Sequence, residues 1–395
     1  MPGRLAALFG YCVIDTLGFG LLIPLVPYMA ERFGTPPQFI TPLLGSYSLC
    51  QFLAAPLWGR LSDRYGRRPI LMSSMAGAFV SYALLGLAGS VWWLLASRML
   101  AGCMAGNIAA AFAYASDIST AQRRTATLGL VGAAIGIGFT LGPPLGGLLA
   151  GADAAHADFL RPALVSMTLS LTALVLVRFV LPESHTPAHR AQHPDRPRAG
   201  ALRLLRARRS LARLCGATLL VTYSQSVLES IFAIWALHRY GFGPRPVGFL
   251  LFAVALPALL MQGGIVRILA PRLGEVRLAQ AGALLYVGGL LLLGAGGGLS
   301  FTLAALLMCG LGLGAYNPSA FALASLHATH AERGAVLGAY SASASLARVI
   351  GPFSSGAAYA QLGSSAPFWV GAMITLPAAW LLGRSAPARE PDRAG

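Results

Sequence analysis

The chain has 395 residues, of which 56% are hydrophobic and only 11% are charged, and its mean hydropathy is +0.67. Apolar stretches of about 20 residues cross a bilayer as helices, so this composition excludes a soluble globular protein and indicates a polytopic membrane protein. The formal net charge is +16, and every basic side chain apart from histidine is arginine. This excess fits the gathering of positive residues on cytoplasmic loops better than nucleic-acid binding.

Twelve apolar stretches are predicted to be membrane helices, which makes the fold class all-α. They lie at about 5–30, 42–59, 70–90, 92–115, 126–150, 161–181, 212–237, 247–269, 278–297, 300–325, 335–360 and 365–384. Arginines concentrate in every second connection, and the 3–4, 9–10 and 11–12 connections are nearly uncharged. By the positive-inside rule, both termini are expected in the cytoplasm.

The chain is predicted to divide into two six-helix bundles at 1–181 and 212–395, joined by a cytoplasmic linker at 182–211. This linker is rich in Arg, Pro and His. It spaces His185, His189 and His193 by four residues, but Pro187 and Pro194 disfavour the helix that would align them as metal ligands. We therefore expect a solvated linker, no metal site and no cofactor.

The two predicted bundles are related by an internal repeat. A shift of 209 residues aligns 115–130 with 324–339 without a gap, and the same shift places Gly142 and Pro143 on Gly351 and Pro352. Parallel six-helix repeats are one of the plans on which secondary transporters are built, with the substrate path between the repeats.

The segment "GRLSDRYGRR" (59–68) is charged, although apolar stretches flank it on both sides. Gly59 and Gly66 permit a tight turn and close approach. The arginines, among them Arg64 and Arg67, suit lipid headgroups, and the acid Asp63 suits the positive end of a helix from the other bundle, the eleventh span. Asp117, at the end of the fourth span, is placed to hold Arg67. The segment is either a gate that closes the cytoplasmic side or a headgroup anchor, and we favour the gate.

Four ionisable residues lie inside predicted spans, where an unpaired charge is costly and function is the default hypothesis. They are Asp15, Arg98, Glu229 and Arg348. Asp15 is the leading proton carrier, the alternative being a structural partner for a backbone break at Pro24. Arg98 is either a proton-coupling residue or a structural residue held by a salt bridge or by hydrogen bonds to backbone carbonyls. Glu229 is expected to face the substrate or the coupling protons, with Arg348 as its partner or that of Asp15, the alternative being a Glu–Arg pair that acts as a structural lock.

Several polar side chains at similar depth are candidates for substrate binding, each with helix–helix hydrogen bonding as its alternative. They are Gln51, Asn107, Tyr114, Gln225 and Asn317, beside Glu229. In the fifth span, glycines recur at helical spacing, which predicts close helix packing, and a bend is predicted at Gly142–Pro143. These glycines are Gly132, Gly136, Gly138, Gly142, Gly146 and Gly147.

These motifs resemble those of the major facilitator superfamily. "GRLSDRYGRR" is similar to the superfamily's signature between spans two and three, G-x-L-x-D-R-x-G-R-[RK]. "GAAIGIGFTLGPPLGG" (132–147) and "RMLAG" (98–102) resemble motifs of its drug:proton antiporter branch, and "DTLGFGLLIPLVP" (15–27) resembles the first span of bacterial tetracycline exporters. The resemblance implies twelve helices in two pseudo-symmetric halves, proton steering by Arg98, and a fifth span that seals against proton leak.

The chain departs from tetracycline exporters at several charged positions. Those exporters carry acids in the third and ninth spans, where this chain has Ser81 and, approximately, Tyr286. Glu229 and Arg348 stand where the exporters have uncharged residues, and a cavity arginine disfavours cationic drugs unless Glu229 neutralises it.

We therefore expect a proton-coupled exporter of amphipathic drugs, tetracycline-type antibiotics first, that works by alternating access. It is expected to act as a monomer in the bacterial cytoplasmic (inner) membrane, with a drug, protons and lipids as partners and no nucleic acid. The alternatives are an exporter of other drugs or of a secreted metabolite, and a proton-coupled nutrient importer. No nucleotide-binding loop or catalytic motif in the sequence points to a pump driven by ATP or to an enzyme.

Overall fold

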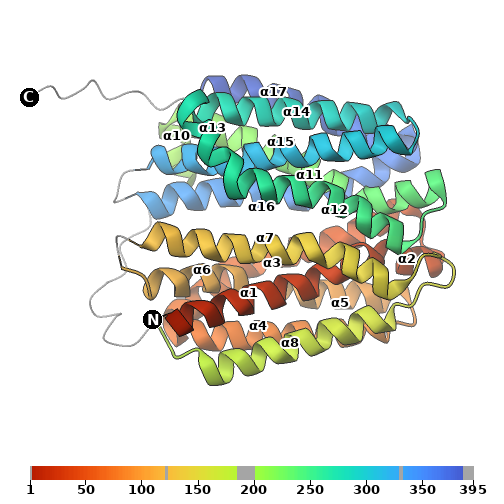
Figure 1. The fold of residues 1–395 in the computed structure, drawn as a ribbon, viewed down its shortest axis with the longest axis horizontal. Coiled ribbons are helices and arrows are strands. Elements are labelled where there is room, and N and C mark those ends of the chain that lie inside the picture. Colours follow the sequence, from red (N-terminus) through yellow and green to blue (C-terminus); the bar gives the residue numbers. More distant parts are fainter. Residues whose placement is uncertain (1, 121–122, 185–200, 329–331, 386–395) are drawn as a thin grey trace, which may run out of the picture. The chain divides into compact units, whose positions relative to one another are not determined.

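The computed structural model describes residues 2–120, 123–184, 201–328 and 332–385, and the elements of this part of the chain are helices (Figure 1). The first eight are α1 (Pro2–Leu22), α2 (Leu25–Arg32), α3 (Pro37–Tyr65), α4 (Arg67–Gly86), α5 (Val91–Cys103), α6 (Asn107–Asp117), α7 (Arg124–Ala150) and α8 (Leu160–Val180). The others are α10 (Ala201–Ala207), α11 (Arg209–Tyr240), α12 (Pro244–Leu260), the π-helix η1 (Met261–Ile265), α13 (Val266–Leu273), α14 (Glu275–Ala295), α15 (Leu299–Leu326), α16 (Arg333–Leu362) and α17 (Ala366–Gly383).

The helices confirm the predicted spans. Eleven helices of the described chain are long and apolar enough to cross a membrane, and three of them are interrupted spans: α1 with α2, α5 with α6, and α12 with η1 and α13. The predicted eleventh span corresponds to α16, which has 30 residues but is not among those eleven. Its five serines, together with Arg348, lower its hydropathy.

The contacts divide the chain into two compact units. Unit 1 comprises Met1–Asp195, Glu229–Ala255 and Pro352–Leu362, and unit 2 comprises Arg196–Leu228, Leu256–Gly351 and Gly363–Gly395. Unit 1 therefore contains α1 to α8 together with one end of α11, α12 and α16. The boundaries predicted from the repeat, at 181 and 212, remain a prediction, because this division follows contacts rather than chain order. The histidines of the linker lie outside the described residues.

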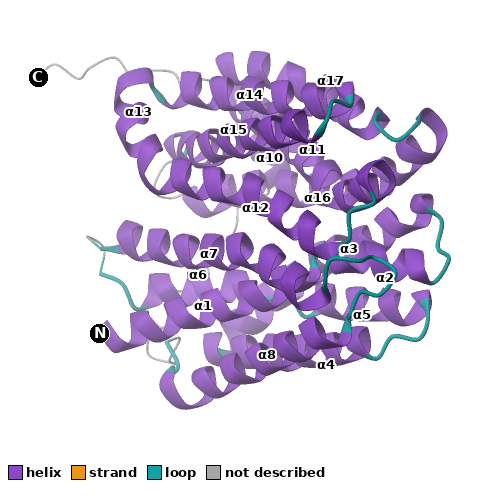
Figure 2. Ribbon diagram, turned by 45° about the vertical axis from the view of Figure 1, so that its right-hand side comes forward, coloured by secondary structure: helices purple, strands orange, loops and turns teal. Residues whose placement is uncertain are grey.

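Unit 1 is built around α1, which packs against α7 and α8 (Figure 2). The core that these helices share with α4 and α6 consists of fully buried apolar side chains such as Leu8, Leu71, Tyr114 and Val177. Other apolar side chains of unit 1 are exposed, among them Phe179 of α8 at 78% and Leu53 of α3 at 66%. Because lipid tails are as apolar as these side chains, this pattern is expected of helices in a bilayer.

In unit 2, α14 packs against both α15 and α17. Small residues bring the backbones of α14 and α15 together. A Cβ atom on Gly282 would lie 2.7 Å from the carbonyl oxygen of Gly312, and one on Gly289 would lie 2.7 Å from that of Ala305. Association of membrane helices depends on such close packing, since apolar burial alone does not favour one helix over lipid.

Candidate functional site

The first and fourth spans are both interrupted near the candidate proton carrier. α1 ends at Leu22 and α2 begins at Leu25, after Pro24, so the backbone break expected at this proline is present. In the fourth span, α5 ends at Cys103 and α6 begins at Asn107. A helix break leaves backbone groups without their usual partners, and the side chains around these breaks supply some of the replacements.

Trp58 of α3 stabilises the interruption of the fourth span. Its indole Nε1 donates a hydrogen bond to the carbonyl oxygen of Cys103 at 2.5 Å. Its ring covers Gly106, where a Cβ atom would lie 2.6 Å from Trp58 Cγ. The missing side chain of Gly106 therefore lets the tryptophan close over the break, and the second half of the span starts at Asn107.

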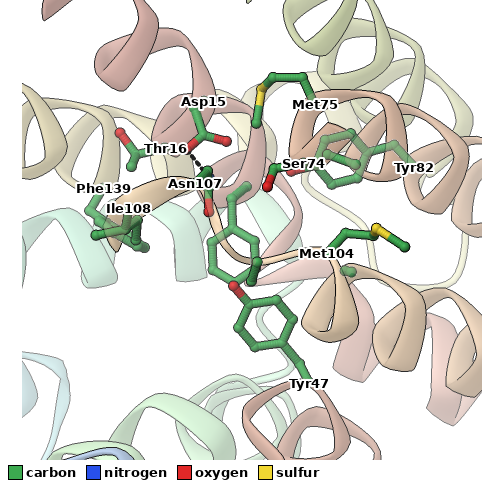
Figure 3. Close-up of a pocket in the computed structure, with 14 residues that line it drawn as sticks. Asp15, Thr16, Tyr47, Ser74, Met75, Tyr82, Met104, Asn107, Ile108 and Phe139 are labelled. Atoms are coloured by element: carbon green, nitrogen blue, oxygen red, sulfur yellow. Dashed lines mark hydrogen bonds between the residues drawn. The ribbon is translucent and has the colours of Figure 1, made fainter. Parts of the chain in front are cut away.

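A pocket in unit 1 is formed where these broken helices meet α3, α4 and α7. It is lined by Asp15, Thr16, Phe19, Tyr47, Ser74, Met75, Ala78, Tyr82, Ala101, Met104, Ala105, Asn107, Ile108 and Phe139 (Figure 3). Asp15, from α1, and Asn107, in the first turn of α6, face one another, and the Asn107 amide donates a hydrogen bond to the Asp15 carboxylate. The structure thus joins two residues that were predicted separately, one for proton coupling and one for substrate binding.

Side chains with hydroxyl groups line the same pocket. Tyr47 reaches into the pocket from the side opposite Asp15 (Figure 3). Ser74 is 2% exposed, and its hydroxyl has no hydrogen-bond partner within the described residues. Tyr82 lines the same pocket and lies within electrostatic range of both Asp15 and Arg98. Sequence reasoning missed these three residues, because serine and tyrosine are common in membrane helices and only the fold turns them toward Asp15.

Arg98, one turn before the interruption, is almost completely buried at 3% exposure. Its Nη2 donates to the Ser97 hydroxyl at 3.4 Å, and its Nε has no hydrogen-bond partner within the described residues. No carboxylate of the described chain forms a salt bridge with it. Of the structural alternatives considered for Arg98, the salt bridge is therefore not observed in this part of the chain.

The charged segment 59–68 forms a connected cluster at the turn from α3 to α4. Gly66 makes this turn with φ of 103°, a conformation that other residues rarely adopt. Arg67 contacts Asp63 at 2.7 Å and Asp117 at 3.4 Å. The predicted contact between Arg67 and Asp117 is confirmed. The gating role of the cluster, and the approach of Asp63 to the eleventh span, stay predictions.

Glu183, which follows α8, is a member of this cluster that sequence reasoning missed. Its carboxylate accepts hydrogen bonds from the backbone N–H groups of Arg67, at 2.8 Å, and of Arg68, at 3.1 Å. These are two of the N–H groups that the start of α4 leaves unpaired. A Cβ atom on Gly66 would lie only 2.5 Å from the carboxyl carbon of Glu183. Glycine is therefore needed here for close approach as well as for its φ.

One other expectation for the segment needs correction. Gly59 makes neither a turn nor a close contact, because α3 continues through it to Tyr65 and no described atom lies within 4 Å of where its Cβ would be. The expectation from the sequence overestimated the importance of Gly59, because glycine is common inside membrane helices. Arg64 lies outside the Arg67 contacts described above, with its guanidinium 5.4 Å from the Tyr65 ring centroid.

The remaining candidates occupy separate places. Tyr114 is fully buried, and its hydroxyl donates to the Pro182 carbonyl at 2.9 Å, so it links α6 to the end of α8. Gln51 is half-buried in α3, and Glu229 is exposed on the part of α11 in unit 1. The candidates of unit 2 are Gln225, Asn317 and Arg348. Their roles in binding and coupling stay predictions.

In α7, the predicted glycine packing is confirmed. A Cβ atom on Gly142 would lie 2.6 Å from Gly20 Cα of α1, and one on Gly146 would overlap the Leu21 backbone. α7 continues through Pro143 and Pro144 as one helix from Arg124 to Ala150. The backbones of α1 and α7 are therefore in direct contact beside the pocket, with no room for side chains.

Comparison with known proteins agrees with this architecture. The family model of the Major Facilitator Superfamily matches residues 8–301 and 214–395. The tetracycline resistance protein, class C, of Escherichia coli is 32% identical over 390 residues, which cover 96% of this chain and 93% of that protein. The major facilitator superfamily domain-containing protein 10 of Bos taurus is 28% identical, with 97% and 93% covered.

A solved structure shows the same fold. The human organic anion transporter MFSD10 (TETRAN) superposes with a TM-score of 0.71 at 25% identity, over 96% of this chain and 99% of that one. This chain belongs to the major facilitator superfamily and has its fold of twelve membrane helices in two pseudo-symmetric six-helix halves. It is a multi-pass membrane protein of a transporter family, whose members carry small molecules.

Proposed function

We propose that this transporter is a proton-coupled exporter of amphipathic drugs, tetracycline-type antibiotics first, that works by alternating access. We place it in the bacterial cytoplasmic membrane with both termini inside, acting as a monomer. The observation that carries the proposal is the pocket in which Asp15 meets the broken fourth span. An acid inside a membrane helix is rarely there for stability alone, and the relatives named as tetracycline resistance proteins support the substrate class.

The geometry of the pocket suggests how it can bind both a drug and a proton. A carboxyl group in a site of low polarity binds or releases a proton as its hydrogen-bond partners change. The partner of Asp15 is Asn107, a neutral amide that a substrate's polar group can replace. The aromatic and thioether side chains around it, Phe19, Phe139 and Met104, provide apolar contact for a ring system. Exchange of drug for proton then requires no second carboxylate in this pocket.

The test is transport by inside-out vesicles that are energised with a proton gradient and offered tetracycline beside a panel of unrelated amphipathic drugs. We expect proton-dependent uptake of tetracycline, and we expect Asp15→Asn to abolish it while the protein remains folded. Asp153→Asn is the matched control, because Asp153 is an acid in an exposed loop and pairs with His156 at 2.6 Å. Proton-coupled uptake at the wild-type rate in the Asp15→Asn vesicles would end the carrier assignment.

A second candidate is export of amphipathic organic anions, one form of the alternative in which tetracycline is not the substrate. It is favoured by Arg98, a buried guanidinium without a carboxylate partner in the described chain, and by the organic anion transporter of the same fold. A buried cation lowers the cost of bringing an anion into a site of low polarity. Proton-dependent uptake of an amphipathic carboxylate or sulfonate, with no uptake of tetracycline, would select this candidate over the first.

The proton-coupled nutrient importer receives less support. The described pocket combines apolar side chains with a few hydroxyl groups, whereas a sugar site needs clusters of hydrogen-bonding side chains. Proton-dependent uptake of a sugar into right-side-out vesicles, without any drug movement, is the result that would favour the importer.

A further inference from the structure

Three side chains from helices far apart in the sequence meet in unit 1. They are Glu31 in the last turn of α2, His238 near the end of α11, and Tyr359 near the end of α16. The imidazole Nε2 of His238 lies 2.8 Å from the Glu31 carboxylate, and its Nδ1 lies 2.7 Å from the Tyr359 hydroxyl. Both ring nitrogens therefore have a partner, each on a different helix.

Other contacts hold the same ends of these helices together. The Tyr28 hydroxyl of α2 donates to the carbonyl oxygen of Phe242, just after α11, at 2.8 Å. Thr41, in α3, is fully buried, and its side chain fills the space beside Gly356 of α16. Residues from α2, α3, α11 and α16 thus enclose this end of unit 1. His238 is the histidine among them, and histidine is the type of side chain whose charge ordinarily changes within the physiological pH range.

The protonation state of His238 changes the strength of this connection. In the neutral ring, Nε2–H donates to Glu31 while Nδ1 accepts from Tyr359. In the protonated ring, both nitrogens donate, and the contact with Glu31 becomes an ion pair. The other carboxylate oxygen of Glu31 is buried without a hydrogen-bond partner in the described chain. A positive charge at His238 therefore stabilises the Glu31 carboxylate, of which only one oxygen has a hydrogen-bond partner in this part of the chain.

We propose that Glu31, His238 and Tyr359 form a pH-dependent latch, which holds the ends of α2, α11 and α16 together and must part when this end of the protein opens. Acid strengthens the latch, because it charges His238 opposite Glu31. The side chains of His238 and Glu31 are 39% and 33% exposed, so protons in the adjoining solution reach them.

The consequence of the latch for the transport cycle rests on the proposed function. If this end faces the acidic side of the membrane, protonation there closes the latch as Asp15 becomes loaded, which favours the return step of an antiporter. At the ends of α2 and α11 that carry the latch, the other titratable and charged groups are Tyr28 and Arg32 of α2 and Arg239 and Tyr240 of α11. Tyr28 is engaged by Phe242, and Arg32 extends toward Ala157 and the Phe159 ring.

The test measures opening directly, without substrate or a proton gradient. Thr41→Cys places a thiol of similar size at a fully buried position in this end, in a full-length chain whose native cysteines have been replaced. The rate at which a water-soluble thiosulfonate labels this thiol in the purified protein reports opening. Variants are compared with the Thr41→Cys protein at the same pH, so the thiol's own reactivity cancels.

His238→Gln supplies an amide donor for Glu31 but never a charge. We expect its labelling rate to match that of the parent at pH 8 and to exceed it by about two- to fivefold at pH 5.5. Tyr359→Phe loses a hydrogen bond in both states of the histidine, so it should be labelled faster at both pH values. His156→Gln is the matched control, since His156 pairs with Asp153 within a single exposed loop. It should behave like the parent.

Equal labelling of the parent and His238→Gln at pH 5.5, or the same acceleration in His156→Gln, would overturn the latch. Both results are independent of transport. A latch that labels as expected in a protein that moves no drug would contradict the proposed function alone, whereas drug export with unchanged labelling would contradict the latch alone.

Discussion

At the scale of single residues, the candidate site depends on where the fourth span is interrupted. Asn107 donates to Asp15 because α6 begins at that residue rather than continuing the path of α5. Trp58 accounts for that position, since its indole replaces the hydrogen bond that the break removes at Cys103 and its ring occupies the space that Gly106 leaves. The hydrogen bond from Trp58 of α3 therefore helps to place Asn107, at the start of α6, beside Asp15, the proposed proton carrier.

Trp58→Phe should weaken this interruption while keeping an aromatic ring over Gly106. The lost hydrogen bond leaves the Cys103 carbonyl unsatisfied, which costs about 1–3 kcal/mol if no water replaces it. We expect a lower melting temperature for the purified protein and slower drug transport. Trp92→Phe, at a tryptophan that is 73% exposed, is the control and should change neither. Equal melting temperatures for the two variants would contradict the role of Trp58.

The sequence alone identified some of these residues and not others, for a physical reason. Asp15 and Arg98 are detectable because a charge inside an apolar stretch is costly and therefore conspicuous. Ser74, Tyr82 and Trp58 carry no such signal, since each is a normal residue in a membrane helix. Their importance comes from neighbours on other helices, and contacts between helices are not visible in a pattern along one of them.

At the scale of elements, the close contact of α7 with α1 depends on a feature that is visible in the sequence, the spacing of glycines. Glycines at helical spacing predicted close packing, and the structure confirms it at Gly138, Gly142 and Gly146. Glycines on other faces of the same helix, such as Gly129 and Gly132, meet no described atom within 4 Å. The spacing thus predicted that α7 packs closely, but only the fold distinguishes the glycines in contact from those facing open space.

This difference gives a matched pair of substitutions in one helix. Gly142→Ala forces a methyl group against the Gly20 backbone, which cannot move aside as a side chain does, and should destabilise the protein by about 1–3 kcal/mol. Gly132→Ala meets no described neighbour and should leave stability unchanged or raise it slightly, because alanine favours helix. Thermal unfolding of the two purified variants is the measurement. A Gly132→Ala protein as unstable as Gly142→Ala would contradict the assignment of the effect to the backbone contact with Gly20.

The start of α4 allows a further prediction at this scale. Glu183 accepts two backbone N–H groups there, and its charge lies at the positive end of the helix. Glu183→Gln keeps an acceptor but loses the charge, so we expect a loss of about 0.5–2 kcal/mol in thermal unfolding. Asp153→Asn, in an exposed loop, is the comparison and should cost little. Unchanged stability in Glu183→Gln would show that water caps the helix equally well.

At the scale of the whole molecule, hydropathy predicted the helices well because the bilayer demands long apolar segments whatever their neighbours are. It predicted the interruptions poorly: Pro24 marked the one between α1 and α2, but the prediction treated the fourth and eighth spans as continuous. It also gave no information about the charged groups at the ends of unit 1. One end carries the latch of Glu31, His238 and Tyr359, and the turn between α3 and α4 carries the cluster around Arg67.

The cluster around Arg67 leads to a prediction about the transport cycle as a whole. A contact made in only one state of a two-state transporter changes the rate of interconversion more than the affinity of a site that lies elsewhere. Asp63 contacts Arg67 and is absent from the lining of the pocket. Asp63→Asn should therefore lower the turnover number for drug efflux by about fivefold, the ratio expected from a partly exposed ion pair of about 1 kcal/mol, and change KM little. Asp153→Asn should alter neither constant. A raised KM with normal turnover would mean that Asp63 acts on binding, and unchanged kinetics would leave the segment 59–68 as a headgroup anchor.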